Sequence, residues 1–362
     1  MRILYFGNYN PNYARNRILI DGLRENGVEV LECNVQGGGF RALPKLFLKY
    51  LKLKTSYDVM IVGFPGQEVM FLARFLTLRF FSGQARKPII FDAFASHYGG
   101  YIIDRKKYPK TSLMAKYYRF LDKWSCRLAD LVLLDTQAHI NFFVEEFNLP
   151  PEKFRRIWIG ADDKVFKPLP FPVEKNVFRV LFFGTFIPLQ GIKYILQAVK
   201  ILEDQNIFFT IIGDGQEKES ILELNHQLNL KNIEFKGKML SEGILTEAKK
   251  CHLCLGIFGD TPKTALVIPN KIYESLAMRR PVISGDTSAC RELFSDDNLM
   301  MVQPADSESL AKAILELKNN LDLRGKLVEN GYNKFIKYCT PKVLGGELKL
   351  LISNLTQINE KK

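Results

Sequence analysis

The sequence predicts an α/β protein made of two doubly wound, Rossmann-like domains. Short apolar runs of strand length alternate with helical stretches, and this rhythm stops at FKPLPFPVEK (166–175) and then starts again. Three prolines within ten residues are typical of a linker. Strands that alternate with helices form parallel sheets covered on both faces. The length, 362 residues, suits two domains of ordinary size.

The first half begins with a buried strand at 2–6, RILYF, and a polar loop. A helical stretch at 16–26 then ends at Gly27, a common helix stop. Further strands of this half are expected at 28–31, 59–62, 89–91 and 131–134. They define a first Rossmann-like domain at 1–165, followed by the linker at 166–175.

The second half repeats the pattern, and four of its five expected strands end in glycine. These strands are expected at 179–184, 208–213, 232–237, 253–259 and 281–284. Helices are expected at 191–204, around 308–338 and at 342–354. We therefore expect a second Rossmann-like domain at 176–340 and a C-terminal helix within 341–362 that packs back on the first domain. With two sheets facing each other, ligands would bind in the cleft at the strand ends.

Two loops at strand ends in the second half are candidates for binding an anion. In FFGTFIPLQGIKYIL (182–196), Gly184 ends a strand and Gly191 begins a helix, so backbone N–H groups can approach a phosphate. In IPNKIYESLAMRRPVI (268–283), a basic loop enters an apolar helix that carries Glu274. Helix starts attract anions, and a carboxylate can accept hydrogen bonds from a diol. A tight strand–helix turn and a solvated glutamate are the simpler interpretations.

The stretch IIGDGQEKESI (211–221) is not a dinucleotide fingerprint. Lys218 stands where the third glycine of GxGxxG would fall, and the loop is not at the first strand of its domain. A strand-end turn at Gly213 is therefore expected in place of a nicotinamide cofactor site.

The second half resembles the family 4 glycosyltransferases, which have the GT-B fold. FGTFIPLQGIKYILQAV resembles the first C-terminal loop of that family, IIGDGQEKESI its Gly-Asp-Gly turn, and PNKIYESLAMRRPVIS its donor-binding helix. RELF (291–294), VQPADSESLAKAI (302–314) and WIGADDKVFKP (158–168) match further segments in the family's order. The resemblance covers nearly the whole chain and implies retaining transfer of a sugar from a nucleoside diphosphate donor.

The resemblance also implies roles for individual residues. Glu274 falls where the family's glutamate contacts the donor ribose, and Glu292 matches a common glutamate. The donor-binding set implied in this way, together with adjoining candidates, is Gly184, Thr185, Gln190, Gly191, Gly213, Asn270, Lys271 and Glu274.

The chain departs from the family pattern at three positions. Thr185 and Gln190 stand where the family often has Arg and Lys, and Leu266 stands where the first glutamate of E-x7-E would fall. Lys271, or Lys263, is the expected replacement for the missing positive charge. These departures predict a variant branch.

The first half offers its own candidates at strand ends. The loop that begins at Gly7 carries Asn8, Arg15 and Asn16 as expected cleft contacts. His97, in FDAFASHYGGY, is the expected contact to the transferred sugar and, with Glu274, the expected catalytic pair. A structural histidine is the alternative.

Charge and cysteine content indicate partners and compartment. The net charge is +12, and residues 1–165 hold 25 basic against 16 acidic residues. A basic amphipathic helix at 41–54, with 71–81 and 105–119 adding basic and aromatic groups, predicts contact with an anionic membrane surface. No nucleic-acid reader module is recognisable. The scattered cysteines predict buried thiols in a reducing cytoplasm, at most peripheral to the inner face of the membrane, with no metal or other cofactor.

The sequence therefore predicts a glycosyltransferase whose acceptor hydroxyl belongs to a saccharide, a lipid-linked saccharide or another cell-envelope glycan. Two alternatives stay open. One is a nucleotide-sugar epimerase or hydrolase on the same fold. The other is a non-catalytic subunit that binds sugar or membrane, for which the missing Arg, Lys and Glu are the best support.

Overall fold

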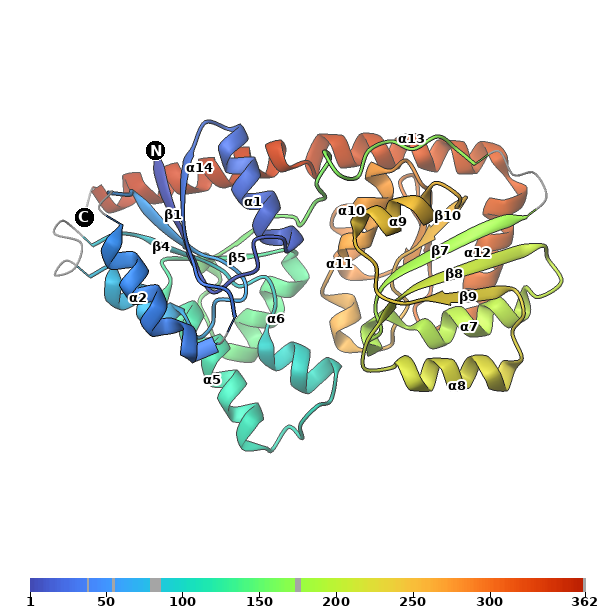
Figure 1. Ribbon diagram of the computed structural model, residues 1–362, viewed down its shortest axis with the longest axis horizontal. Coiled ribbons are helices and arrows are strands. Elements are labelled where there is room, and N and C mark those ends of the chain that lie inside the picture. Colours follow the sequence, from blue (N-terminus) through green and yellow to red (C-terminus); the bar gives the residue numbers. More distant parts are fainter. Residues whose placement is uncertain (38, 54–55, 79–85, 173–176, 361–362) are drawn as a thin grey trace. The chain divides into compact units, whose positions relative to one another are not determined.

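The computed structural model describes residues 1–37, 39–53, 56–78, 86–172 and 177–360. They form two compact α/β units (Figure 1), one of Met1–Gly160 with Tyr338–Lys362 and one of Ala161–Lys337. The unit boundaries thus fall five residues before the expected end at 165 and three before the expected end at 340. Parts of the expected segments, at residues 54, 79–81, 173–176 and 361–362, lie outside the described residues.

The first unit contains a parallel sheet with the strand order β2-β1-β3-β4-β5-β6. Its strands are β1 (Arg2–Gly7), β2 (Glu29–Asn34), β3 (Val59–Val62), β4 (Ile89–Asp92), β5 (Leu131–Leu134) and β6 (Phe154–Arg156). The inner strands β3, β4 and β5 are buried on both faces, which explains why their residues are apolar except for Asp92 at the end of β4. The short edge strand β6 was not expected from the sequence.

Helices cover both faces of this sheet. They are α1 (Ala14–Glu25), α2 (Leu43–Lys52), α3 (Met70–Leu76), α5 (Leu113–Leu128), α6 (Gln137–Phe147) and, from the far end of the chain, α14 (Pro341–Glu360). One apolar core joins α2, α3, α5 and α6 to alternate strand residues such as Leu4 and Met60. Figure 1 shows α2 and α5 on one side of the sheet and α1 with α14 on the other.

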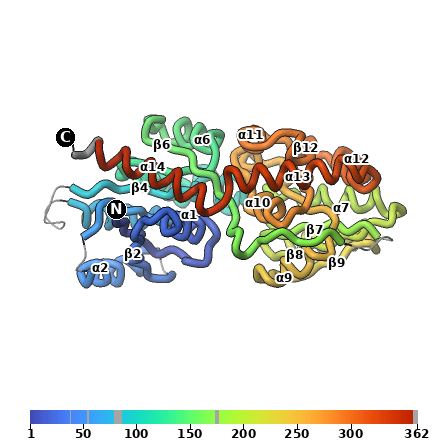
Figure 2. Tube along the Cα trace, turned by 90° about the horizontal axis from the view of Figure 1, so that it is seen from above, coloured from blue at the N-terminus to red at the C-terminus, as the bar shows by residue number. Residues whose placement is uncertain are grey.

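Helix α14 packs closely along α1 (Figure 2). Gly22 and Gly345 face each other so tightly that a Cβ on either would overlap the backbone of the other helix. Asn26 and Lys349 add hydrogen bonds of 2.8 Å across this contact, to Lys342 O and Asn26 O. The last helix is therefore part of the first unit's fold.

The second unit has a parallel sheet with the order β12-β11-β10-β7-β8-β9. Its strands are β7 (Phe178–Thr185), β8 (Ile207–Asp214), β9 (Ile233–Lys236), β10 (Leu253–Leu255), β11 (Val282–Gly285) and β12 (Met300–Val302). The expected strand at 253–259 is wrong after Leu255. There the chain leaves the sheet and bonds to a neighbouring loop, with Phe258 N donating to Gln190 O at 3.0 Å.

Helices also lie on both faces of the second sheet. They are α7 (Ile192–Ile201), α8 (Lys218–Leu228), α9 (Ser241–Ala248), α10 (Asn270–Ala277), α11 (Ser288–Arg291), α12 (Ser307–Asn319) and α13 (Leu321–Tyr338). Figure 1 shows α7 and α8 on one face and α9 and α10 on the other. In this doubly wound sheet the strand order reverses at β7, between β10 and β8.

Candidate functional site

The strand order of the second sheet reverses at β7, which pairs with β8 on one side and β10 on the other. In doubly wound sheets the crevice beyond such a reversal, at the carboxyl ends of the strands, is where ligands bind. The two loops at this point are residues 186–191, after β7, and residues 256–260, after β10. They are the starting point for the candidate site.

The loop after β7 needs glycine at its last position. Gly191 has φ +66°, and a Cβ there would overlap the backbone of Phe258 and Gly259. Gly259 N also donates to Leu189 O at 3.2 Å, so the two loops are bonded to each other. Gly191 is the N-cap of α7 and has no side chain to offer the helix, which leaves the helix start open to an anion.

Lys271, in the first turn of α10, reaches under this loop. Its Nζ donates to Gln190 Oε1 at 2.5 Å and to Gly256 O at 3.4 Å, and it lies 3.5 Å from the centre of the Phe182 ring. A Cβ on Gly184 would stand 2.8 Å from the same Nζ. The missing side chain of the half-buried Gly184 therefore lets the amine lie against the backbone at the end of β7, a position that we call the Gly184 window.

Among the described residues, no acidic side chain directly contacts the Lys271 amine to balance its charge. The side chain is buried, and burial lowers the pKa of its amine well below the usual value, although Glu274 raises it in part. Its two hydrogen-bond partners are neutral oxygens, and among the described residues no carboxylate lies in ion-pair contact with it. An anion placed at the Gly184 window would restore the charged form.

The other candidates of the second unit lie around this centre. Glu274 is half-buried one turn further along α10, and Asn270 begins that helix, whose N-cap is Pro269 without a side-chain cap. Thr185 is exposed at the end of β7. Gly213 pairs with Gly184 in neighbouring strands, and its close approach to Gly184 O excludes a side chain there.

Lys263 and Glu292 belong to two elements that pack on each other. Lys263 lies in the 3-10 turn Pro262–Ala265, which packs on α11, and Ser288 Oγ donates to Ala265 O at 2.9 Å. Glu292 is the C-cap of α11. Both side chains are half-buried. The residues that the structure groups most closely are Gly184, Gln190 and Lys271.

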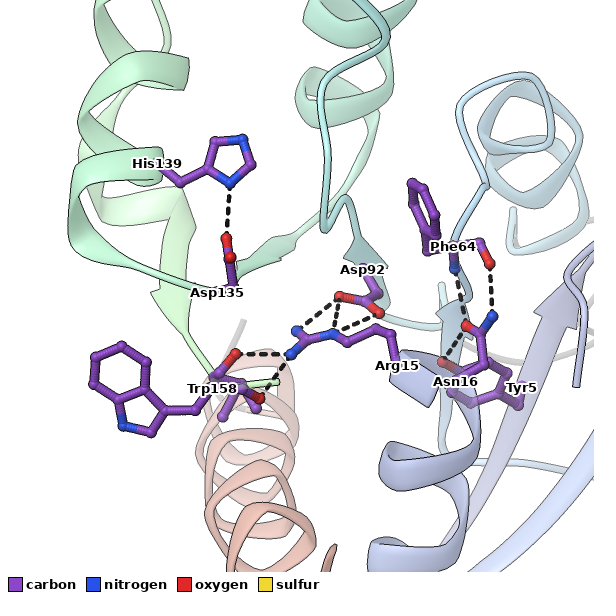
Figure 3. A network of polar contacts seen from close by, with 9 residues as sticks. Tyr5, Arg15, Asn16, Phe64, Asp92, Asp135, His139 and Trp158 are labelled. Atoms are coloured by element: carbon purple, nitrogen blue, oxygen red, sulfur yellow. Dashed lines mark hydrogen bonds and ion pairs between the residues drawn. The ribbon is translucent and has the colours of Figure 1, made fainter. Parts of the chain in front are cut away.

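Arg15, an expected cleft contact in the first unit, is fully buried (Figure 3). Its guanidinium bonds to both carboxylate oxygens of Asp92 at 2.9–3.1 Å and to the carbonyls of Ile157 and Trp158 at 2.7 and 2.9 Å. Burial opposes its charge, but Asp92 outweighs this and raises the pKa of the guanidinium. The expectation of a ligand contact is corrected, because the side chain ties β4 to the segment after β6.

Asn16 is likewise buried, with its amide used internally. Its Oδ1 accepts from Tyr5 Oη and Phe64 N, both at 3.1 Å, and its Nδ2 donates to Phe64 O at 2.7 Å (Figure 3). It fixes the loop after β3 and is not a cleft contact. Gly7 is also buried at the end of β1, whereas Asn8 is half-buried and its Oδ1 has no hydrogen-bond partner.

His97 is positioned by a residue that the sequence did not reveal. Asp122, fully buried on α5, accepts hydrogen bonds from the backbone N–H groups of His97 and Tyr98 at 3.1 and 2.9 Å and from Ser96 Oγ at 2.7 Å. The half-buried ring of His97 lies beside Tyr101 and Tyr118, and its Nδ1 has no hydrogen-bond partner. Asp122 lies 25 residues away in sequence on an ordinary helix, so no local pattern predicts it.

Two cysteines with the spacing of a metal-binding pair lie close together in the second unit. Cys251 and Cys254 have their sulfurs 3.7 Å apart as free thiols inside the second unit. Within the described ranges no group of three or more His, Cys, Asp or Glu side chains could hold a metal ion. In the same part of the chain, no helix combines the length and apolar character needed to cross a membrane.

Comparison with known proteins finds a family match within the second unit. Residues 177–320 match the family of glycosyl transferases group 1. An uncharacterized glycosyltransferase of Methanocaldococcus jannaschii is 28% identical over 47% of this chain and 46% of its own length. The lipopolysaccharide core biosynthesis glycosyltransferase LpsE of Rhizobium meliloti is 24% identical over 48% and 49%. The chain thus spans about half the length of the curated relatives it matches.

The fold is shared over the whole chain with solved glycosyltransferases. Anabaena HepE, in complex with UDP and glucose, has a TM-score of 0.73 at 17% identity and covers 98% of this chain and 100% of its own. The two parallel-sheet α/β units therefore have the GT-B fold, as the sequence predicted.

Proposed function

We propose that the protein is a glycosyltransferase that moves a sugar from a nucleoside diphosphate sugar to a hydroxyl group. The observation that carries the proposal is the Lys271 amine, which lies under the Gly184 window without a carboxylate partner. Family resemblance at 177–320 and the likeness to a protein solved with UDP support it. UDP is the first nucleotide to test.

The leaving diphosphate is the group that this site is suited to stabilise. As the bond from the anomeric carbon to the diphosphate oxygen breaks, negative charge grows on the diphosphate. Lys271, the N–H groups of the 184–191 loop and the uncapped start of α7 lie where they can bind that charge. Glu274, close enough to raise the pKa of Lys271, is assigned to the ribose hydroxyls.

We further propose transfer with retention of configuration. The acceptor oxygen attacks the anomeric carbon from the side of the leaving group, and its proton passes to a diphosphate oxygen, releasing the nucleoside diphosphate. No protein carboxylate base is needed, which suits a chain with Leu266 in the place of the missing glutamate. No metal or other cofactor takes part in this scheme. His97, with its unpartnered Nδ1, is assigned to the sugar.

The acceptor class follows from charge. The excess of basic over acidic residues in 1–165, and the exposed lysines of α2, suit an acceptor held at an anionic membrane. We therefore propose a lipid-linked saccharide or another cell-envelope glycan at the cytoplasmic face. The Rhizobium relative named for lipopolysaccharide core biosynthesis supports this class.

Thermal unfolding with UDP, GDP, ADP, TDP and CMP, each at about 1 mM, tests the nucleotide site. A ligand at ~100 times its dissociation constant stabilises the fold by about 2.7 kcal/mol, which raises the midpoint by a few degrees. We expect one nucleoside diphosphate, UDP first, to give this rise and Glu274→Ala to reduce it. If no nucleotide changes the midpoint, the non-catalytic alternative replaces the enzyme.

Release of UDP from UDP-sugars, measured with and without added glycans, then separates the enzymatic alternatives. A transferase releases UDP fast only when an acceptor is present. Steady turnover of the donor without any acceptor would instead identify the epimerase or hydrolase.

A further inference from the structure

Helices α3 and α5 of the first unit carry large apolar side chains that the fold leaves exposed. They are Phe71, Phe75 and Leu78 from α3 and the turn that follows it, and Phe120 and Trp124 from α5, each 38–50% exposed. We call these five residues the aromatic patch. Phe71, Phe75 and Leu78 lie within the segment 71–81 that the sequence indicated for membrane contact, whereas Phe120 and Trp124 lie just beyond the segment 105–119.

The two helices form one continuous surface at this patch. The rings of Phe71 and Phe120 are stacked, with centres 6.2 Å apart and an interplanar angle of 9°. Trp124 lies next to Phe120, one helical turn on, at 6.0 Å. Soluble proteins seldom expose several large apolar side chains in contact with one another, and such a surface usually serves binding.

The exposed charges that α5 itself places beside the patch are cations. Lys116, Lys123 and Arg127 follow the helical spacing of Phe120 and Trp124 along α5, and the Arg127 guanidinium lies 5.3 Å from the centre of the Trp124 ring. The one acidic residue of α5, Asp122, is buried and points into the unit. Every exposed charged side chain of this helix is therefore a cation.

A second basic helix lies on the same face of the sheet. Helix α2 shares the core of α3 and α5 through Leu46, and it carries exposed Lys45, Lys49 and Lys52 with no acidic residue. Aromatic rings flanked by lysine and arginine match the boundary between headgroups and acyl chains of an anionic bilayer. A water-facing protein partner would not require this excess of cations on α5 and α2.

We propose that the aromatic patch inserts into the interface of an anionic membrane, with the cations of α5 and α2 contacting the lipid headgroups. The patch would anchor the first unit at the surface without a spanning helix. This inference stands apart from sugar transfer, because it is measured without any nucleotide or acceptor.

The two tryptophans of the chain allow a direct test with the full-length protein. Trp124 belongs to the patch, whereas Trp158 is 5% exposed and lies against Arg156. We expect the protein to co-sediment with vesicles of phosphatidylglycerol and phosphatidylcholine, and less with phosphatidylcholine alone. Its fluorescence should move to shorter wavelength on binding. Trp124→Phe should bind but lose most of that shift.

Serine substitutions separate the patch from general charge. Phe71→Ser, Phe75→Ser and Phe120→Ser together should weaken vesicle binding about tenfold or more, because interfacial affinity scales with buried apolar area. Leu240→Ser, at a 78% exposed leucine of the second unit, is the matched control and should bind like the wild type. Circular dichroism checks that each variant is folded.

Three outcomes would overturn the proposal. The first is no binding to anionic vesicles. The second is binding with unchanged Trp124 emission, which would place the contact elsewhere. The third is self-association that the triple serine variant abolishes while vesicles are ignored, which would make the patch an interface between copies of this chain.

Discussion

Arg15 and Lys271 are both buried cations near the carboxyl ends of a parallel sheet, but their surroundings differ. Arg15 has a carboxylate and two carbonyl groups around its guanidinium. Lys271 has two neutral oxygens and an aromatic ring around its amine, which lies against the backbone of Gly184. A buried charge that is fully paired holds a fold together, whereas one paired only with neutral groups is costly until an anion arrives.

The comparison makes its strongest prediction for Arg15→Met. Asp92 would be left buried without its cation, and breaking such a pair costs about 3–5 kcal/mol. Urea unfolding should show a loss of this size. Arg15→Met with Asp92→Leu should recover part of it, because no lone charge stays buried. A loss below ~1 kcal/mol for Arg15→Met alone would mean that the pair does not hold the unit together.

Lys271→Met should do the opposite, leaving stability nearly unchanged and weakening nucleotide binding. A charge-assisted hydrogen bond contributes about 1.5–3 kcal/mol, so UDP affinity should fall roughly 10- to 100-fold in calorimetry. Lys193→Met, at an exposed lysine of α7 already paired with Asp260, is the matched control.

A swap of the two side chains extends this experiment. Gln190→Lys combined with Lys271→Gln puts the cation in the loop, and it should restore much of the lost affinity. If Lys271→Met instead lowered stability and left UDP binding intact, the lysine would be structural.

The smallest predicted effect is the uptake of protons when the nucleoside diphosphate binds. Because burial lowers the pKa of Lys271, the free protein holds a neutral amine at pH values above that lowered pKa, and a bound diphosphate restores its charge. Binding should then take up as much as about one proton, and affinity should fall as pH rises. Calorimetry in buffers of different ionisation enthalpy measures this uptake. Equal heats in all buffers would contradict it.

Without ligand, the same lowered pKa has a defined effect on stability. The unfolded lysine, with its ordinary pKa, binds more protons than the folded one. This group's contribution to stability therefore rises with pH between the lowered pKa and the ordinary one. Lys271→Met should remove that part of the slope in urea unfolding at several pH values.

The sequence was sufficient for the fold because its signals are local and repeated. Apolar runs such as VMIV and LVLL mark strands buried on both faces, and the helical periods between them mark the crossovers. Gly191 could be identified from the sequence as a candidate site residue, because the turn from a strand into a helix restricts the backbone at that position. The three-residue strands β6 and β12 carry too few residues for such a pattern.

The candidate site was harder to predict, because burial depends on contacts distant in sequence. Arg15 and Asn16 stand in a polar loop and helix start that look solvent-facing, yet Asp92 and Phe64 enclose them. Lys271 was expected to replace a missing positive charge, but the sequence did not indicate that its amine reaches inward to a residue 81 positions earlier. Only the pairing of strands brings these partners together.

The contact of α14 with α1 also determines the order in which the chain can fold during synthesis. All of the second unit, Ala161–Lys337, is synthesised before the helix that closes the first unit. Until that helix is made, the face of α1 around Gly22 is without its covering helix. Completion of the first unit therefore waits for a segment that is translated after the whole of the second unit.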